Sequence, residues 1–267
     1  MRQFSQVVRE DTGVKIRILG SGTSSGVPRI GNDWGACDPL NPRNRRTRAS
    51  MLVSTETTRI LIDTSPDMRE QLLAADVDNV DAVIWTHDHA DHCHGIDDLR
   101  QIYHARGEPV RGFARPATLA SLVTRFPYVF EGRSGYHSTT AIAPLPDAFT
   151  VGDIHVRVVD QPHGSITSAG LRFESAGKSI GYATDFNALT EDMEALYEGL
   201  DVWVVDALRL APHPTHPHLS MVLDWVRKLR PRRTALMHMD NSMDYATLAA
   251  SLPAGVEPGY DGLELVA

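Results

Sequence analysis

The sequence contains few cysteines and no long hydrophobic run. Only Cys37 and Cys93 occur in 267 residues, and two isolated cysteines make no disulfide framework, so a reducing compartment such as the cytoplasm is expected. No stretch approaches the roughly 18 consecutive apolar residues that a membrane-spanning helix needs, so no membrane association is expected. Residues 1–11 have no continuous apolar core and carry acidic residues, so they do not predict a secretory signal.

The chain also lacks an excess of positive charge. It has 26 Lys and Arg against 34 Asp and Glu, a formal net charge of -8. A protein that binds long nucleic acid by neutralising phosphates needs a dominant basic surface, so that class is not expected. A composition of 42% hydrophobic and 22% charged residues is that of a globular protein. No repeat or linker marks a boundary, which predicts a single domain over residues 1–267.

A dense histidine cluster occupies residues 86–95, Thr-His-Asp-His-Ala-Asp-His-Cys-His-Gly, directly after an apolar run. Alternate residues of an extended segment point the same way, so His87 and His89 can hold one metal ion. Asp91 and His92, displaced by the next turn, can reach a second ion. The alternative is a polar loop that happens to be rich in histidine. We favour the metal site because no packing role needs this cluster.

Hydrophobic periodicity predicts two β-rich groups of elements, each closing with helices. Such a pattern fits an α/β fold with four layers. Ser65, followed by Pro66, predicts the N-cap of a helix, and Thr190 predicts the N-cap of another. The predicted strands cover residues 14–19, 51–55, 60–63, 81–86, 149–151, 154–160, 169–174, 179–183, 202–205 and 234–237, and further helices are predicted near 96–104, 116–125 and 221–229.

Four motifs together resemble a known family. They are Ile18–Pro28 (Ile-Leu-Gly-Ser-Gly-Thr-Ser-Ser-Gly-Val-Pro), Thr86–His92, Gly181–Asp185 (Gly-Tyr-Ala-Thr-Asp) and Leu236–His238. From about residue 15 to its end, the chain resembles the metallo-β-lactamase superfamily. It is most similar to the phosphodiesterase branch, which includes the enzyme of the carbon–phosphorus lyase pathway that opens phosphoribosyl 1,2-cyclic phosphate. The resemblance implies an αββα sandwich with a dinuclear site at the edge of two facing sheets.

The resemblance also implies the other metal ligands. His163, Asp185 and His238 each follow a predicted strand, and their order along the chain matches that of the family. Taken singly, a histidine or aspartate at such a place is usually a surface, turn or cap residue. The ligands are histidines and carboxylates without thiolate, so two divalent ions are expected, with Zn, Mn and Fe all open. By this assignment His87, His89 and His163 bind one ion, Asp91, His92 and His238 bind the other, and Asp185 bridges them.

A second histidine-rich segment, residues 212–220, lies in the predicted loop between strand 202–205 and helix 221–229. Related enzymes place a histidine that contacts the substrate in this loop. His216 and His218 are therefore both candidate catalytic residues, and the sequence does not decide between them. The alternative is that these histidines only cap the following helix.

The segment after the first strand differs from that of some relatives. Gly20–Gly26 lacks the spacing of a nucleotide-binding loop and predicts a turn that borders the metal site, where glycines let a ligand approach closely. Several relatives then carry a cysteine-rich insert that binds a structural zinc. Here Cys37 is the only thiol of the segment, and Asn241 stands where a later histidine ligand would fall, so no structural zinc is expected. Packing by Trp34 is expected to anchor the segment instead.

Four arginines follow in the same segment, at positions 43, 45, 46 and 48. Such clusters commonly form a solvated face. Arg48 comes closest to a strand and is the candidate for binding a phosphate oxygen of the substrate.

Two metal ions can lower the pKa of a bridging water to near neutrality and stabilise charge on an attacked centre. The sequence thus predicts a metal-dependent hydrolase, and first of all a phosphodiesterase for small cyclic phosphodiesters or nucleotides. In it a metal-bridging hydroxide would attack phosphorus, and His216 or His218 would steady or protonate the leaving alkoxide. The alternatives are a tRNA 3′-end endonuclease, a thioester or lactam hydrolase, and a non-catalytic metal-holding scaffold. A homodimer is left open.

Overall fold

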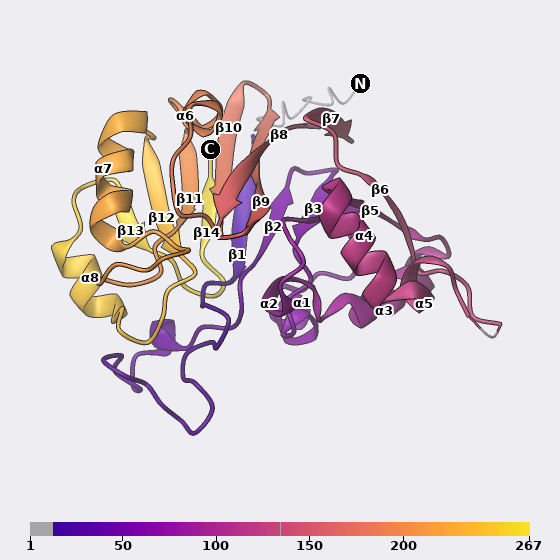
Figure 1. The fold of residues 1–267 in the computed structure, drawn as a ribbon, viewed down its shortest axis with the longest axis horizontal. Helices are drawn as coiled ribbons and strands as arrows, with labels where there is room; N and C mark the ends of the chain where they lie inside the picture. Colours follow the sequence, from indigo (N-terminus) through magenta and orange to yellow (C-terminus); the bar gives the residue numbers. More distant parts are fainter. Residues whose placement is uncertain (1–12, 134) are drawn as a thin grey trace, which may run out of the picture.

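The computed structural model describes residues 13–133 and 135–267, and within them two β-sheets lie face to face (Figure 1). Residues 1–11, where no secretory signal is predicted, lie outside the described residues. The first sheet has the strand order β14-β1-β2-β3-β4-β5-β6, and the second has the order β13-β12-β11-β10-β9-β8-β7. The first sheet contains β1 (Lys15–Gly20), β2 (Ser50–Ser54), β3 (Arg59–Ile62), β4 (Ala82–Trp85), β5 (Val110–Ala114), β6 (Thr140–Pro144) and β14 (Glu264–Val266). The second contains β7 (Ala148–Val151), β8 (Ile154–His163), β9 (Ile166–Ser175), β10 (Lys178–Ala183), β11 (Val202–Asp206), β12 (Arg233–Met237) and β13 (Val256–Pro258).

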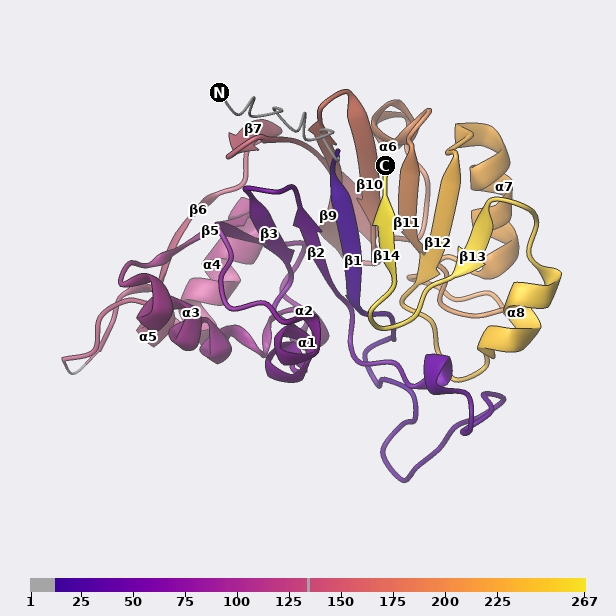
Figure 2. The same cartoon turned by 180° about the vertical axis from the view of Figure 1, so that it is seen from behind.

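Helices cover the outer face of each sheet, which gives four layers (Figure 2). This arrangement confirms the predicted α/β class and the αββα sandwich. Beside the first sheet lie α1 (Met68–Ala75), α2 (Ala90–Cys93), α3 (Leu99–Arg106), α4 (Pro116–Arg125) and α5 (Pro127–Phe130), and beside the second lie α6 (Glu191–Tyr197), α7 (Leu219–Leu229) and α8 (Tyr245–Ser251). Short 3₁₀ helices cover Pro42–Asn44 and Ile96–Asp98. None of the helices in the described ranges is long and apolar enough to cross a membrane.

The largest core lies between the two sheets and is built by alternation along the strands. In β8, Ile154, Val156 and Val158 point into this core, whereas His155 and Arg157 between them are exposed. The central strand β11 is buried on both faces because helices cover its outer side. This double burial explains why residues 202–205 of β11 form an unbroken apolar run.

Strand direction places several strand ends at one edge of the sandwich. Strands β3 to β6 run parallel in the first sheet, and β10 to β13 run parallel in the second. The carboxyl ends of parallel strands meet at the same edge of a sheet. Residues that directly follow β4, β10 and β12 are therefore brought together.

Some local predictions were wrong. Ser65 is not a helix N-cap, because α1 begins at Met68 after Asp67. Instead, the Ser65 hydroxyl accepts a hydrogen bond from the Asp67 N–H and donates one to Gln71, so Ser65 forms the turn before the helix. Thr190 does cap α6 through the Met193 N–H, as predicted. The sequence pattern missed β5, which contains Gly112 where a side chain would collide with the Trp85 ring at 2.6 Å.

The segment between β1 and β2 is anchored by a buried guanidinium. Arg46 is 2% exposed, and it donates hydrogen bonds to the carbonyl oxygens of Asp240, at 3.1 Å, and Met243. The prediction of a solvated face is thus wrong for Arg46. Trp34, the predicted anchor, is only half-buried and stacks with Arg45. Polar contacts with a distant segment replace the expected hydrophobic anchor.

Two further contacts tie this segment to the region after β12. The Ala36 N–H donates to the Asn241 carbonyl at 2.8 Å, and the Asn44 amide donates to the Asp244 carboxylate at 2.7 Å. Cys37 is buried beside Arg46 and, like Cys93, is a free thiol. Within the described residues, these hydrogen bonds hold the β1–β2 segment against the region after β12.

Candidate metal centre

The histidine loop leaves β4 and turns at once into α2. His87 is fully buried, and His89 has an extended backbone just before the helix. Asp91 and His92 follow His89 by two and three residues, within the single turn of α2. The change from extended to helical backbone separates the four side chains into two directions. The structure therefore places His87 and His89 in one group of side chains and Asp91 and His92 in another.

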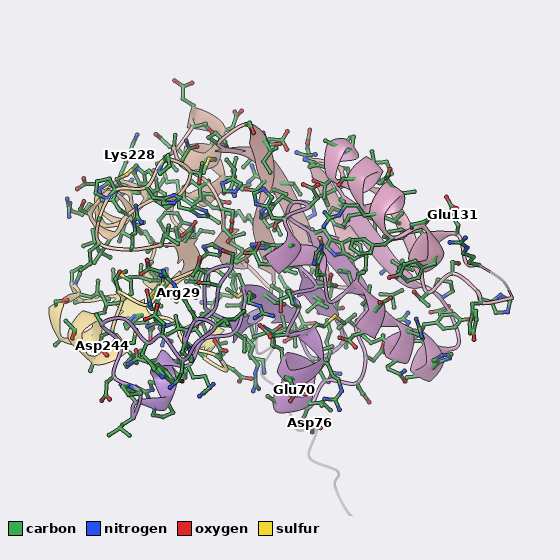
Figure 3. The ribbon with its side chains drawn as sticks, turned by 60° about the horizontal axis from the view of Figure 1, so that its bottom comes forward. Arg29, Glu70, Asp76, Glu131, Lys228 and Asp244 are labelled. Carbon is green, nitrogen blue, oxygen red and sulfur yellow. The ribbon has the colours of Figure 1, made fainter. Side chains whose placement is uncertain are left out.

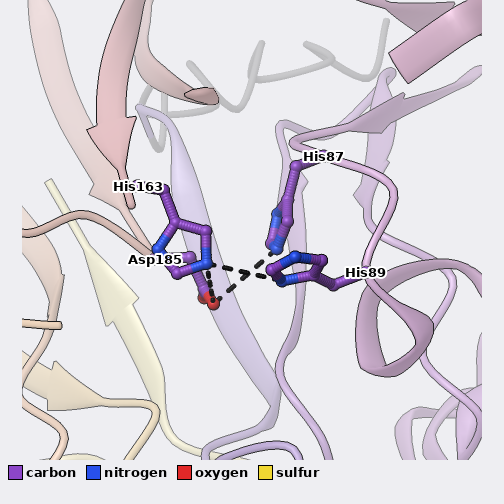
Figure 4. Close-up of side chains that lie close together, drawn as sticks. All are labelled: His87, His89, His163 and Asp185. Atoms are coloured by element: carbon purple, nitrogen blue, oxygen red, sulfur yellow. Dashed lines mark hydrogen bonds and ion pairs between the residues drawn. The ribbon is translucent and has the colours of Figure 1, made fainter. Parts of the chain in front are cut away.

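His87, His89, His163 and Asp185 form the first cluster (Figure 4). The Nε2 atom of His163 lies 3.4 Å from Nδ1 of His89 and 3.6 Å from Oδ2 of Asp185. The same Asp185 oxygen lies 3.7 Å from Nε2 of His87. His163 is delivered by the end of β8, and Asp185 follows β10. Three imidazoles and one carboxylate oxygen thus surround one position.

The second cluster contains Asp91, His92 and His238. Oδ2 of Asp91 lies 3.4 Å from Nε2 of His92 and 3.5 Å from Nε2 of His238. The other oxygen of Asp185, Oδ1, lies 3.3 Å from Nε2 of His92 and 3.4 Å from Nε2 of His238. One Asp185 oxygen therefore faces each cluster.

His216 lies beside both clusters, but His218 does not. Nδ1 of His216 is 2.7 Å from Oδ2 of the buried Asp206, and its Nε2 is 3.8 Å from Oδ2 of Asp185. Its ring stacks on that of His238 at 4.9 Å between centroids. His218 stands at the start of α7, and its side chain makes no cap hydrogen bond. The geometry thus distinguishes two residues that the sequence could not.

A cavity of about 220 Å³ opens over the clusters. The candidate metal ligands that line it are His89, Asp91, His163, Asp185 and His238. The other side chains at its walls are Ser24, Ser165, Ile166, Thr215 and His216. Because His216 lines this cavity, its Nε2 atom faces the place where a substrate would bind.

Comparison with known proteins places this geometry in a family. The model of the beta-lactamase superfamily domain matches residues 58–239. A solved structure described as a new diphosphatase from the PhnP family is 34% identical, with a TM-score of 0.87 over 95% of this chain and 96% of that one. The chain belongs to the metallo-β-lactamase superfamily and its PhnP family. Family membership and this likeness indicate a metal-dependent hydrolase.

Two other relatives extend the comparison. An octanoyltransferase of Porphyromonas gingivalis (strain ATCC BAA-308 / W83) is 33% identical over 258 residues, which cover 93% of this chain and 51% of that protein. The chain thus spans about half the length of this relative. The structure of zinc-bound PqqB from Methylobacterium extorquens is 22% identical, with a TM-score of 0.74 over 95% of this chain and 100% of that one. At that identity the likeness shows the fold alone.

Two aspartates that the sequence analysis missed lie behind the clusters and contact histidine rings of the site. Asp63 is fully buried, and its Oδ2 lies 2.7 Å from Nδ1 of His92. Oδ2 of Asp206 likewise lies 2.7 Å from Nδ1 of His216, and it also accepts a hydrogen bond from the Asp185 N–H at 3.2 Å. A carboxylate on the second imidazole nitrogen orients the ring and fixes its tautomer. The missed signal was an aspartate at the end of an apolar strand, as in the recognised Asp185.

The backbone leaves the strands sharply at these positions. Asp63, Asp185 and His238 have positive φ angles of 63°, 52° and 55°. Such left-handed conformations are costly for residues other than glycine, and they concentrate at functional sites. Asp185 and His238 line the cavity, whereas Asp63 lies behind it and contacts His92.

Burial and mutual charges shift the pKa values of the clustered side chains. Burial, together with the charge of His92, holds the pKa of His87 well below its usual range. Burial also lowers the pKa of His238, but Asp185 and Asp206 outweigh this effect and raise it to about 9. The pKa of Asp185 lies well below its usual value because nearby imidazoles outweigh its burial. The carboxylates thus attract positive charge into the site.

Buried nitrogen atoms show that these residues fit a metal. Nε2 of His87, His92 and His238 are buried and have no hydrogen-bond partner among the described residues. Unsatisfied buried polar atoms are rare because they lose hydration without compensation. All three atoms face the carboxylate oxygens of the clusters, where a divalent cation would satisfy them.

Arg48 does not line the cavity. Its Nε atom is 2.9 Å from Oδ2 of Asp67, the residue before α1. This ion pair directs the guanidinium toward α1, so the structure does not bring the predicted phosphate-binding arginine to the clusters. The prediction that Arg48 contacts a substrate has no support from this geometry.

Proposed function

We propose that this protein is a dinuclear metal-dependent phosphodiesterase that acts on small phosphodiesters. The position of Asp185 carries the proposal, because its two oxygens face two separate sets of ligands at 3.3–3.7 Å. His87, His89 and His163 would hold one ion, and Asp91, His92 and His238 would hold the other. The set contains no thiolate and suits Zn, Mn or Fe.

Bound divalent ions would supply Lewis-acid stabilisation of a phosphoryl group and lower the pKa of a bound water. The buried aspartates contribute by orienting the rings. Asp63 accepts hydrogen bonds from the Thr86 N–H at 2.7 Å and from its hydroxyl at 2.8 Å, which fixes the carboxylate that contacts His92. The ligands are thus held in place before any ion binds, which reduces the cost of binding.

His216 is our candidate for the general acid. Its contact with Asp206 orients the ring, so that Nε2 can hold a proton toward a leaving alkoxide in the cavity. His218 lacks this position. Of the two candidates from the sequence, we therefore propose His216 alone for the catalytic role.

A phosphodiester is favoured over other substrates by two observations. The solved relative with 34% identity is described as a diphosphatase of the PhnP family, so that protein acts on a phosphorus centre. The cavity of about 220 Å³ is small, which favours a compact ligand over a polymer.

The test compares substrates on one metal-supplemented preparation. We expect bis(p-nitrophenyl) phosphate to be hydrolysed faster than p-nitrophenyl phosphate, a thioester, a lactam or a short RNA. Elemental analysis of the same sample should give close to two divalent ions per chain. His216→Ala should lose activity on an alkyl diester, whereas His104→Ala, on the exposed side of α3, should not. Faster turnover of the lactam or thioester by the fully metallated protein contradicts the proposal.

A further inference from the structure

The turn that follows β1 is fixed beside the second cluster. The Gly26 N–H donates to the Thr23 carbonyl at 2.8 Å, which closes a β-turn over four residues. The Thr23 N–H donates to the Met239 carbonyl at 3.3 Å, and the Met239 N–H donates to the Ser21 carbonyl at 3.0 Å. Because Met239 directly follows His238, these bonds set the turn at a fixed place relative to a candidate metal ligand.

The base of the turn has no room to shift. Val27 and Arg46 exchange two backbone hydrogen bonds, of 2.9 and 2.8 Å. At Gly22, a Cβ atom would lie 2.9 Å from both the Arg46 Cβ and the Thr47 carbonyl oxygen. The chain thus passes through a gap that only glycine fits. A rigid turn can hold donor groups in position without paying for ordering them on binding.

The turn carries donor groups that have no hydrogen-bond partner in the described chain, and its residue Ser24 lines the cavity. Ser24 and Ser25 are exposed, and the side chain of Ser24 lines the cavity over the clusters. Within the described part of the chain, neither backbone N–H has a hydrogen-bond partner, and neither has the Ser24 hydroxyl. The Ser25 hydroxyl instead lies 3.4 Å from the Gly26 carbonyl. Successive free N–H groups in a turn form a concave site that favours anions.

Arg29 follows the turn by three residues, and its guanidinium pairs with two carboxylates, Asp33 and Asp240. Figure 3 labels Arg29 on the face that this view brings forward. The Arg29 guanidinium is 3.7 Å from Oδ2 of Asp240, two residues after His238, and its side chain is 42% exposed. Because the charge of Arg29 is already paired with Asp240 and Asp33, the preference for an anionic group rests on the backbone donors and the Ser24 hydroxyl.

We propose that the Thr23–Gly26 turn binds a second phosphoryl group of the substrate, next to the phosphoryl group that reacts. This inference rests on the proposed function and narrows it to diphosphate diesters. The metal ligands would bind the reacting phosphoryl group, and Ser24 with the two free N–H groups would bind its neighbour. The turn is thus a determinant of specificity and takes no part in bond breaking.

Two variants at one position separate the donor groups. Ser24→Ala removes only the hydroxyl. Ser24→Pro removes the hydroxyl and one N–H, and it keeps the fold because proline is favoured at the second position of a β-turn. Ser25→Ala is the matched control, since this neighbouring serine does not line the cavity. Melting temperatures of all three variants should stay near that of the wild type.

Binding to the metal-loaded protein gives a readout that does not depend on turnover. The probes are dimethyl phosphate and the symmetric dimethyl ester of methylenediphosphonate, called the diphosphate probe below. Its P–C–P bridge cannot be hydrolysed, it carries one methyl group on each phosphoryl, and binding is measured by calorimetry. We expect the wild type and Ser25→Ala to bind the diphosphate more tightly than the monophosphate. Ser24→Pro should weaken diphosphate binding about tenfold, as the loss of a hydrogen bond to a charged group predicts. Its binding of dimethyl phosphate should change less than about twofold, and Ser24→Ala should lie between.

The proposal is overturned if the wild type binds the two probes equally, or if Ser24→Pro keeps the full preference for the diphosphate. Its failure can be told apart from failure of the proposed function. If the wild type binds the diphosphate selectively and Ser24→Pro loses that selectivity, but no diester is hydrolysed, the turn has its inferred role and the proposed phosphodiesterase activity is wrong. If diesters are hydrolysed and Ser24→Pro keeps its selectivity, the activity stands and the turn has no such role.

Discussion

The candidate metal centre has two halves of different origin. The loop half consists of His87, His89, Asp91 and His92, all within six consecutive residues. The strand-end half consists of His163, Asp185 and His238, which follow β8, β10 and β12 or end them. Local backbone geometry is enough to orient the first half. The second half exists only because the second sheet aligns the ends of its strands at one edge.

The two halves also differ in what supports them. Behind the loop half stands Asp63, which contacts His92 from the neighbouring strand β3. Behind the strand-end half stands Asp206, which contacts His216 and the Asp185 N–H. The strand-end half depends further on the β1–β2 segment, because Arg46 holds the carbonyl of Asp240 just after His238. The loop half is thus a local unit, whereas the strand-end half depends on distant contacts.

Replacing Asp185 should have the largest effect, because its two oxygens face the two clusters. Asp185→Asn removes the charge between the two clusters, so metal content should fall from two ions per chain toward one. Activity on a diester should fall by about 10³-fold or more, as loss of metal-ion catalysis predicts. Elemental analysis and steady-state kinetics measure the two effects. The exposed Asp192→Asn is the control, and unchanged metal content in Asp185→Asn would contradict the division into two halves.

Variants of His216 and His218 should differ, because His216 lies at the site and His218 lies at the start of α7. His216→Ala should lower kcat about 10²–10⁴-fold on a diester with a poor alcohol leaving group, the range for a general acid. The loss on an activated nitrophenyl diester should be much smaller, since that leaving group needs no proton. His218→Ala should retain kcat on both. Equal losses on the two substrates would exclude His216 as the acid.

The two supporting aspartates should have different signatures. Asp63→Asn should weaken metal binding about 10–100-fold, the usual cost of removing a carboxylate behind a ligand histidine. Its activity at saturating metal should fall equally for poor and good leaving groups. Asp206→Asn should instead affect the poor leaving group more strongly, because Asp206 contacts His216. Metal titrations and paired kinetics distinguish the two, and identical profiles would show that the halves share their support.

Arg46 tests whether the strand-end half depends on the β1–β2 segment. Arg46→Met leaves buried carbonyl oxygens of Asp240 and Met243 without partners, so stability should fall by about 2 kcal/mol in denaturant unfolding. The affinity for the ion that uses His238 should fall with it. Cys37→Ser, beside Arg46, should cost about 1 kcal/mol or less and keep both ions. Loss of an ion from Cys37→Ser would mean that the thiol is a ligand after all.

Asp244 should have the smallest effect, and one that depends on pH. Burial raises the pKa of Asp244, but hydrogen bonds from Thr247 and Asn44 outweigh this and lower it to about 2. A folded pKa below the unfolded value near 3.9 adds stability above that value, and this stability is lost as pH falls toward 2. Asp244→Asn should therefore cost less than about 1 kcal/mol at pH 6, because the carboxylate is only partly buried and asparagine keeps a side-chain oxygen that can accept hydrogen bonds. The difference from wild type should shrink between pH 5 and pH 3, and a growing difference would contradict this account.

The fold and part of the candidate site could be predicted from the sequence. The αββα sandwich is confirmed, since family motifs and strand periodicity both pointed to it. The ligand roles and the single domain over residues 1–267 stay predictions. The error at Arg46 has a tertiary cause, because it depends on which distant residues lie beside it, whereas the partners of Ser65, Asp67 and Gln71, are local. Arg46 lies in a cluster of arginines, which predicts a solvated side chain. Only the structure shows its partners, the carbonyls of Asp240 and Met243.

By itself the sequence determined the loop half of the site, because residues two or three apart have directions set by local backbone geometry. It also determined the class of ligand chemistry, since histidine and aspartate without cysteine limit the metals that bind. Tertiary structure alone decided that His216 faces the cavity and His218 does not. It also decided that Asp63 and Asp206 support the site and that Ser24 lines its edge. These relations join segments far apart in the chain, and their distances depend on sheet packing, which no local pattern encodes.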